Sequence, residues 1–240
     1  MDNSELLSRL IAPLGLEITR KETFERFELY CARLIEKNEV MNITTITDPV
    51  EIYTRHFADS LAPAAALPRP GSSIDVGCGG GFPGLPLKIF FDDAAPDAVK
   101  LTLLDSTAKK IDFLRELTAE MGLKNVSFDT RRAEDAAKDP ALREKFDMAT
   151  SRAVTAMPAL CELCLPFVKV GGVFAAHKSV RASEEVDLGR RAAGHLGGSY
   201  GEFFPYTMGD VEAFIVPVAK KKPTPSEFPR PWAKIKKKPL

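Results

Sequence analysis

The segment Asp75-Val-Gly-Cys-Gly-Gly-Gly-Phe-Pro-Gly84 holds the residues whose types and spacing best suit ligand binding. A glycine-rich turn between a strand and a helix lets a ligand approach the backbone closely, and the helix N-terminus attracts a negative group. Gly79, Gly81 and Gly84 have the spacing of a dinucleotide-binding turn. Asp105 follows about 20 residues later, where an acid binds ribose hydroxyls. The sequence therefore predicts a nucleoside-containing ligand.

Three interpretations of this segment are open: a turn with a purely geometric role, a nicotinamide or flavin site, and an S-adenosylmethionine site. An acid such as Asp105 serves the ribose of either cofactor. Asp75 stands two places before Gly77 and suits a cationic ligand better than a pyrophosphate, and Pro83 and Pro86 bracket a tight helix start. These features favour S-adenosylmethionine, with Asp75, Gly77, Gly79 and Asp105 among the residues that bind it.

Alternating strand and helix patterns must position this segment. Short apolar runs predict strands at 73–76, 101–104, 126–128, 146–150 and 173–176, and amphipathic or apolar segments predict helices after Pro83 and at 106–121, 158–165 and 183–196. Such alternation predicts an α/β fold in which a parallel sheet carries helices on both faces. Segments 203–206 and 214–218 are expected to close the sheet as antiparallel strands.

The two ends of the chain differ from this centre. Residues 1–65 are predicted to form a helical extension, because apolar residues from Phe24 to Ile35 recur at helical spacing and Asp48-Pro49 suits the start of a second helix at 50–61. Residues 66–218 would form the main domain. Prolines among lysines predict an extended tail at 219–240.

The overall charge is balanced, with 33 Lys and Arg residues against 33 Asp and Glu residues, but it is unevenly distributed. The tail carries a net charge of +7 and the rest of the chain −7. The tail has two interpretations: a solubilising end, or an RNA anchor in which Phe228 and Trp232 stack on unpaired bases. No apolar run approaches the ~18 residues of a membrane-spanning helix.

The four cysteines are too few for a disulfide framework and indicate a reducing, cytoplasmic location. Cys161 and Cys164 have a spacing found in metal and redox sites, but they lie in an apolar helical segment without a second pair. Core packing is the expected role, and no metal site is predicted.

Further motifs around the glycine segment resemble the RsmG (GidB) family, the bacterial guanine-N7 methyltransferases of small-subunit ribosomal RNA. The resemblance covers about residues 38–178. Its motifs are Met41-Asn-Ile-Thr, Asp48-Pro, Arg55-His-Phe-Ala-Asp-Ser-Leu, the glycine segment with its Gly-Phe-Pro-Gly-Leu-Pro extension, Leu103-Leu-Asp-Ser, Lys109-Lys-Ile-Asp-Phe-Leu, Arg132-Ala-Glu and Ser151-Arg-Ala. The resemblance implies a class I, Rossmann-like methyltransferase fold with an N-terminal helical extension, S-adenosylmethionine as methyl donor, and 16S ribosomal RNA as partner.

The resemblance also implies roles for individual residues. Gly77 and Phe82 would contact the cofactor, Ala133 and Glu134 would lie near its adenine, and Arg152 would lie at its methionine end or over the substrate. One departure concerns the last core strand, before which family members commonly carry an arginine; Glu212 or Ala213 stands there in this chain. A basic contact to RNA or substrate from that strand is therefore in question.

Methylation of guanine N7 needs no general base, because N7 carries a lone pair and no proton. The expected work of the protein is alignment, for which Arg152 and Lys178, at the carboxyl ends of neighbouring strands, are candidates to hold the nucleotide. His56 and Asp59 share one helix face, as a wall of the active site or as an ordinary solvated face. Asn42 either caps a helix or contacts the substrate.

Two other functions stay open at this stage. A non-catalytic RNA-binding or ribosome-associated factor would keep the fold, and the altered Glu212-Ala213 region and the tail motivate this alternative. A small-molecule methyltransferase would not depend on residues 219–240. We expect the protein to act as a monomer.

Overall fold

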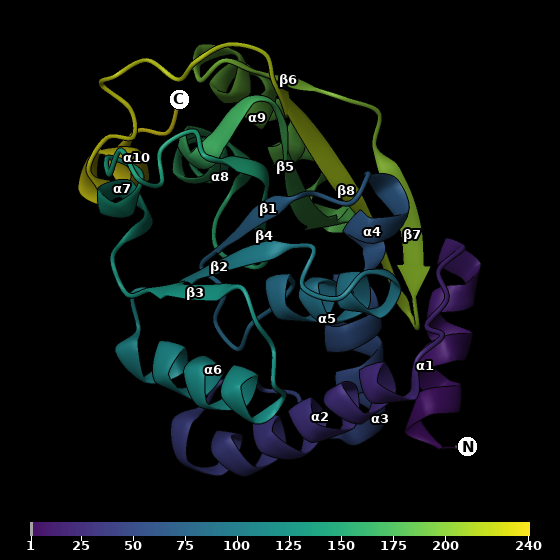
Figure 1. The fold of residues 1–240 in the computed structure, drawn as a ribbon. Helices are drawn as coiled ribbons and strands as arrows, with labels where there is room; N and C mark the ends of the chain where they lie inside the picture. The colour runs from purple at the N-terminus through teal and green to yellow at the C-terminus, as the bar shows by residue number, and fades with distance from the viewer. Residues whose placement is uncertain (1) are drawn as a thin grey trace.

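A mixed eight-stranded sheet forms the centre of the computed structural model, which describes residues 2–240 (Figure 1). Its strand order is β3-β2-β1-β4-β5-β8-β6, and β7 pairs with β8 beside this path. The first five strands in this order are parallel, and β8 runs antiparallel to its neighbours β5, β6 and β7. The strands are β1 (Ser72–Val76), β2 (Lys100–Leu104), β3 (Val126–Asp129), β4 (Phe146–Ser151), β5 (Val168–Ser179), β6 (Gly198–Tyr200), β7 (Phe204–Met208) and β8 (Val211–Lys220).

Helices cover both faces of the sheet, as the sequence predicts. On one face, α2, α5 and α6 share an apolar core with β2, and on the other α7, α8, α9 and α10 pack against β1 and β4 (Figure 1). The helices are α1 (Asn3–Ile11), α2 (Lys21–Met41), α3 (Pro49–Glu51), α4 (Ala62–Ala66), α5 (Gly84–Ala94), α6 (Ala108–Glu120), α7 (Ala133–Ala136), α8 (Met157–Cys164), α9 (Ser183–His195) and α10 (Trp232–Lys237). Within residues 2–240, no helix is long and apolar enough to cross a bilayer.

The N-terminal extension is helical, as predicted, but one stretch winds differently. The Asp48 side chain accepts a hydrogen bond from the Glu51 amide and caps the helix start. The chain then forms a π-helix over Ile52–Ala58, in place of the predicted α-helix. π-helical turns are rare and are frequently found at functional sites. Here it carries Arg55 and His56, with Asp59 directly after it.

The C-terminal stretch corrects the predicted extended tail. Lys220 is buried at the end of β8, and residues 232–237 form α10, whose Ile235 is completely buried. The prediction was wrong because it considered the prolines and lysines alone. Carbonyl and carboxylate groups from distant parts of the chain accept hydrogen bonds from Lys220 and Arg230 and compensate their charges.

All four cysteines are buried and unpaired, and Cys161 and Cys164 belong to α8 and pack in the apolar core. Burial raises the pKa of the Cys161 thiol to about 12, so it stays protonated near neutral pH. No cluster of three metal-binding side chains occurs among the described residues. The complete burial of Cys161 and Cys164 in the apolar core is what assigns this pair to core packing, as predicted.

Candidate functional site

A cavity of about 480 Å³ opens at the carboxyl ends of β1, β2 and β4. The chain adds β2 and β3 on one side of β1, and β4 and β5 on the other, so the strand order reverses between β1 and β4. Open α/β sheets bind ligands at such a reversal. The volume lies within the range of small-molecule sites, ~300–1,000 Å³. The lining side chains come from four loops at this edge of the sheet and from both ends of the chain.

The glycine loop forms the floor of this cavity. The amides of Gly77 and Cys78 donate to the carbonyl of Leu104, at 2.8 and 3.0 Å, and fix the loop to the end of β2. Gly77 has a φ of 73°, and a Cβ there would lie 2.6 Å from the Val154 side chain. Gly79 has a φ of 55° and no atom within 4 Å of the corresponding position. The sequence of this loop therefore keeps one side open for a ligand.

Asp75 lies beneath the loop and is completely buried. Its carboxylate accepts hydrogen bonds from the Gly84 amide at 2.9 Å and the Thr150 hydroxyl at 3.1 Å. Burial raises its pKa to about 7. The structure thus places Asp75 behind the residues that line the cavity, where it holds the start of α5 against β1 and β4.

The other predicted cofactor residues line the cavity, namely Gly77, Gly79, Phe82, Asp105, Ala133, Glu134 and Arg152. Asp105 accepts hydrogen bonds from the amides of Gly79 and Thr107, at 2.9 and 2.8 Å, which hold its carboxylate at the end of β2. Ala133 and Glu134 begin α7, after β3. The acid and the α7 start thus belong to one wall, beside the glycine loop.

Phe82 stands at the centre of an aromatic stack that joins the loop to the N-terminal extension. The Tyr30 ring lies parallel to it, with centroids 5.4 Å apart, and the His56 ring stacks on it at 4.4 Å. The Tyr30 hydroxyl donates to the Gly80 carbonyl at 2.5 Å. Sequence reasoning missed Tyr30; its only signal was its position on the buried face of α2.

Arg152 connects the cavity to the same extension. Its guanidinium donates to the carboxylate of Asp59 at 2.5 Å and to the Arg55 carbonyl at 2.9 Å, and lies 3.2 Å from Nδ1 of His56. It also lies over the Phe82 ring, 5.2 Å from the centroid. Arg152 thus joins His56 and Asp59, which the sequence placed together on one helix face, in one cluster.

The cluster has an asymmetric charge distribution. Burial and the neighbouring Arg152 lower the pKa of His56 to about 4, so its ring is neutral near pH 7. Burial raises the pKa of Asp59, but Arg152, His177 and the Tyr206 hydroxyl outweigh this and lower it overall. The Tyr206 hydroxyl donates to the second carboxylate oxygen at 2.7 Å. Asp59 is therefore an anion held between β4 and β7.

Lys178 and Asn42 lie outside both the cavity wall and this cluster. Lys178 donates to the Thr155 carbonyl at 3.0 Å and pairs with Glu185. Its charge is therefore directed at α9 and at the loop after β4. Asn42 ends α2 in the left-handed conformation, with a φ of 48°, and its amide donates to the Asn38 carbonyl. This geometry favours the capping role for Asn42.

The altered segment before the last strand lies at the β7–β8 hairpin. Glu212 is exposed and pairs with Thr207, while Ala213 is buried. Arg55 of the π-helix reaches this hairpin and pairs with Asp210 at 3.2 Å. A basic side chain thus lies next to the hairpin, but it comes from the N-terminal extension.

The side chains that line the cavity match the chemical groups of S-adenosylmethionine. Asp105 and Glu134 offer carboxylates for hydroxyl and amino groups, and the glycine loop leaves backbone accessible. Val76, Leu104 and Leu163 supply an apolar surface for a base. Ile43, just after α2, and Trp232, at the start of α10, also line the cavity and were not predicted as site residues.

Solved structures share this fold. A putative O-methyltransferase from Klebsiella pneumoniae covers 92% of this chain and 100% of its own, with a TM-score of 0.57 at 12% identity. The O-methyltransferase TomG from Streptomyces achromogenes, solved in complex with SAM, gives the same coverage and TM-score at 13% identity. At such low identity the likeness concerns the fold alone.

Fold and cavity together define a class I S-adenosylmethionine-dependent methyltransferase. The family described as rRNA small subunit methyltransferase G (GidB) matches residues 23–200. Two curated proteins named ribosomal RNA small subunit methyltransferase G resemble the chain over nearly its whole length. The one from Geobacillus thermodenitrificans is 42% identical over 91% of this chain and 92% of its own, and the one from Oceanobacillus iheyensis is 39% identical over 94% of each. The chain belongs to this family.

Proposed function

We propose that this protein transfers a methyl group from S-adenosylmethionine to N7 of a guanine in 16S ribosomal RNA. The observation that carries the proposal is the position of Arg152. It lines the cavity and donates hydrogen bonds to Asp59 and to the Arg55 carbonyl of the N-terminal extension. A nucleotide that enters between the cavity and the N-terminal extension would meet the Arg152 guanidinium.

The residues divide the work of cofactor binding between them. S-adenosylmethionine supplies the methyl group when bound. Asp105 would bind the ribose hydroxyls, and Ala133 and Glu134 would lie beside the adenine. Gly77 and Gly79, which lack side chains, would let the cofactor approach the backbone closely. Phe82, fixed between Tyr30 and His56, would shape the end of the site near Arg152. Asp75 would keep the loop in place from beneath.

Acceptor chemistry requires alignment and no proton removal. The neutral His56 ring matches this need, because its low pKa makes it a structural surface for Phe82 and not a cation near a developing positive base. Alignment of reacting groups supplies ~7–11 kcal/mol in favourable cases. Arg152 would orient the guanine through O6 or a phosphate, since N7 itself must stay free. Lys178, through Glu185, would support the loop that carries Arg152.

An in vitro assay tests this function directly. Small ribosomal subunits from cells that lack the gene would be incubated with the purified protein and labelled methyl donor, and the RNA cleaved chemically at 7-methylguanosine. A single new cleavage site in 16S RNA is expected with the wild-type protein and none with Asp105→Ala. Labelling at another atom, or of small molecules alone, would reject the proposal.

Calorimetry separates the non-catalytic alternative. A factor that only binds ribosomes has no need of the cofactor, whereas the enzyme must bind S-adenosylmethionine in the cavity that residues 77–80 help to line. We further propose that the enzyme works as a monomer in the cytoplasm. Sedimentation of the purified protein and fractionation of cells test these two points.

A further inference from the structure

Trp232 contributes the C-terminal end of the chain to the cofactor cavity. It is the only tryptophan in the sequence, and it starts α10. Its side chain is partly buried and lines the same cavity as Ala133, Glu134 and Leu163. Figure 1 shows α10 beside α7, across the sheet from α2. The segment that the sequence assigned to a solvent-exposed tail thus forms part of the site.

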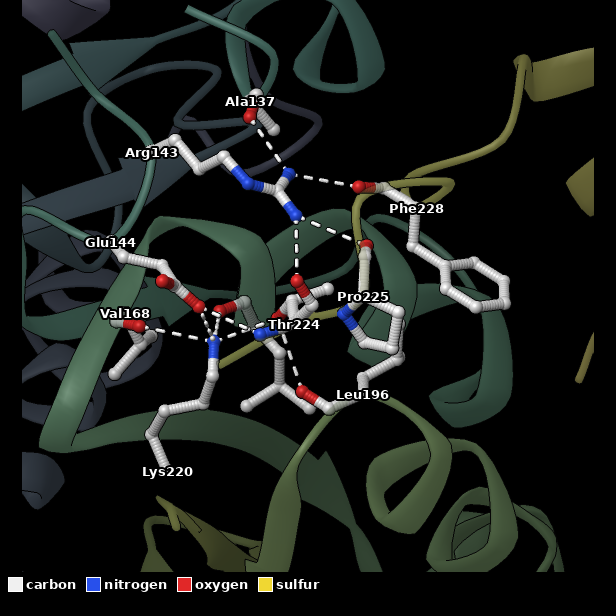
Figure 2. A network of polar contacts seen from close by, with 10 residues as sticks. Ala137, Arg143, Glu144, Val168, Leu196, Lys220, Thr224, Pro225 and Phe228 are labelled. Atoms are coloured by element: carbon white, nitrogen blue, oxygen red, sulfur yellow. Dashed lines mark hydrogen bonds and ion pairs between the residues drawn. The ribbon is translucent and has the colours of Figure 1, made fainter. Parts of the chain in front are cut away.

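A buried network holds the start of this segment in place (Figure 2). The Lys220 ammonium donates to the carbonyls of Leu165 and Val168, at 2.6 and 3.1 Å, and to the Thr224 hydroxyl at 2.7 Å. Glu144 pairs with Lys220 at 3.1 Å and accepts the Thr224 amide at 2.7 Å. Lys220 is completely buried, and a buried charge needs such partners. The network compensates this charge and fixes the direction in which the chain leaves β8.

Arg143 extends the network along the segment. Figure 2 shows its guanidinium reaching the carbonyls of Thr224, Pro225 and Phe228, with donor–acceptor distances of 2.9, 3.1 and 2.8 Å. It also donates to the Ala137 carbonyl, next to the end of α7. The same side chain therefore ties the C-terminal segment to the element that begins with Ala133 and Glu134.

A second anchor lies immediately before Trp232. Arg230 donates to both carboxylate oxygens of Glu162, at 2.8 and 2.6 Å, and its amide donates to the same carboxylate at 2.8 Å. Glu162 belongs to α8 and is completely buried. Three sets of contacts, made by Lys220, Arg230 and the buried Ile235, fix the position of the indole on the cavity wall.

We propose that Trp232 is an adenine-binding residue, and that segment 221–240 is a fixed wall of the S-adenosylmethionine site. The inference rests on cofactor binding as the proposed function requires it. An indole beside an apolar wall offers a large flat surface for a purine ring. Its place among the residues that line the cavity favours the cofactor over an unpaired RNA base, which would approach from outside.

The single tryptophan makes the test direct. Wild-type protein would be titrated with S-adenosylhomocysteine, with tryptophan fluorescence and calorimetry recorded in parallel. Adenine stacked on Trp232 is expected to quench the emission with the same dissociation constant that calorimetry gives. Trp232→Ala should weaken the affinity by about tenfold or more, and Trp232→Phe should retain most of it.

Glu227→Gln, at an exposed position in the same segment, is the matched control and should bind as tightly as wild type. Thermal unfolding of each variant detects any general loss of structure. Normal calorimetric binding with unchanged fluorescence and an unaltered Trp232→Ala affinity would overturn the inference but leave the methyltransferase proposal standing. No binding by any variant or by wild type would overturn both. A change in fluorescence on adding RNA alone, with no change on adding S-adenosylhomocysteine, would assign the indole to RNA binding and overturn the inference.

Discussion

Asp59 and Arg152 are joined by an ion pair of 2.5 Å that links the N-terminal extension to the end of β4. The two side chains are each only 15% exposed, and Tyr206 and the Arg55 carbonyl complete their hydrogen bonds. The pair therefore fixes the guanidinium beside the cavity and attaches the extension to the catalytic sheet. Five predictions follow from this geometry and from the segments around it.

Replacing Asp59 by asparagine should misplace Arg152 without removing it. We expect kcat/KM for the RNA to fall by about 100-fold, because small misplacements cost that much, with little change in cofactor affinity. The free energy of unfolding should fall by ~1–3 kcal/mol, the value of a charged hydrogen bond. Asp210→Asn, which removes the exposed pair with Arg55, should cost less than ~1 kcal/mol. Equal effects of the two variants would contradict this account.

His56 should make the stability depend on pH in a defined direction. An unfolded histidine binds a proton below about pH 6.5, but the folded pKa of His56 is about 4. The unfolded state therefore binds more protons in this window, and the contribution of His56 to stability falls as the pH drops from 6.5 to 4. The difference in unfolding free energy between wild type and His56→Asn should shrink over the same window. His195→Asn, at an exposed position of α9, serves as control.

A methyl group at Gly84 should disturb the cofactor loop from beneath. Its Cβ would lie 2.6 Å from the Cβ of Asp75, which is completely buried and cannot move aside. Gly84→Ala should lower the free energy of unfolding by ~1–3 kcal/mol and weaken cofactor binding. Gly194→Ala, in α9 with no atom within 4 Å of the new Cβ, should be neutral or slightly stabilising. Denaturant unfolding and calorimetry measure both effects.

The Arg230–Glu162 pair can be tested by a double-mutant cycle. Arg230→Ala leaves the buried Glu162 carboxylate without its cation, so the free energy of unfolding should fall by ~3–5 kcal/mol. Adding Glu162→Gln to that variant should recover part of the loss, since the uncompensated charge is gone. Cofactor affinity should follow the same order. Additive effects of the two substitutions would show that the pair does not hold the segment.

The exposed lysines of α10 and its end should act on RNA alone. Lys234, Lys236, Lys237 and Lys238 lie on the surface, unlike the buried Lys220. Changing all four to alanine should reduce the slope of log affinity against log salt by at most about 3, with cofactor affinity unchanged. Filter binding to 16S RNA at several salt concentrations measures the slope. An unchanged slope would remove the lysines from the RNA-binding surface.

Residues 70–180 show how much of the sheet could be predicted. The strands, the helix after Pro83 and the glycine turn between them follow from short apolar runs and from glycine, which are local properties. The π-helix at Ile52–Ala58 was missed, since its sequence also fits an α-helix. Asp75 was recognised as significant, but its burial beneath the loop depends on where β4 and Gly84 lie.

The sequence by itself determined the alternating architecture, the open glycine loop and the acid at the end of β2, and through its motifs the family. Only the tertiary structure decided the partners of the charged residues: Asp59 with Arg152, Glu162 with Arg230, and Glu144 with Lys220. It also decided that Trp232 lines the cavity at the carboxyl ends of β1, β2 and β4. The physical reason is that backbone preference and apolar periodicity act over a few residues. Compensation of a buried charge depends on which distant segments the packed core brings within hydrogen-bonding distance.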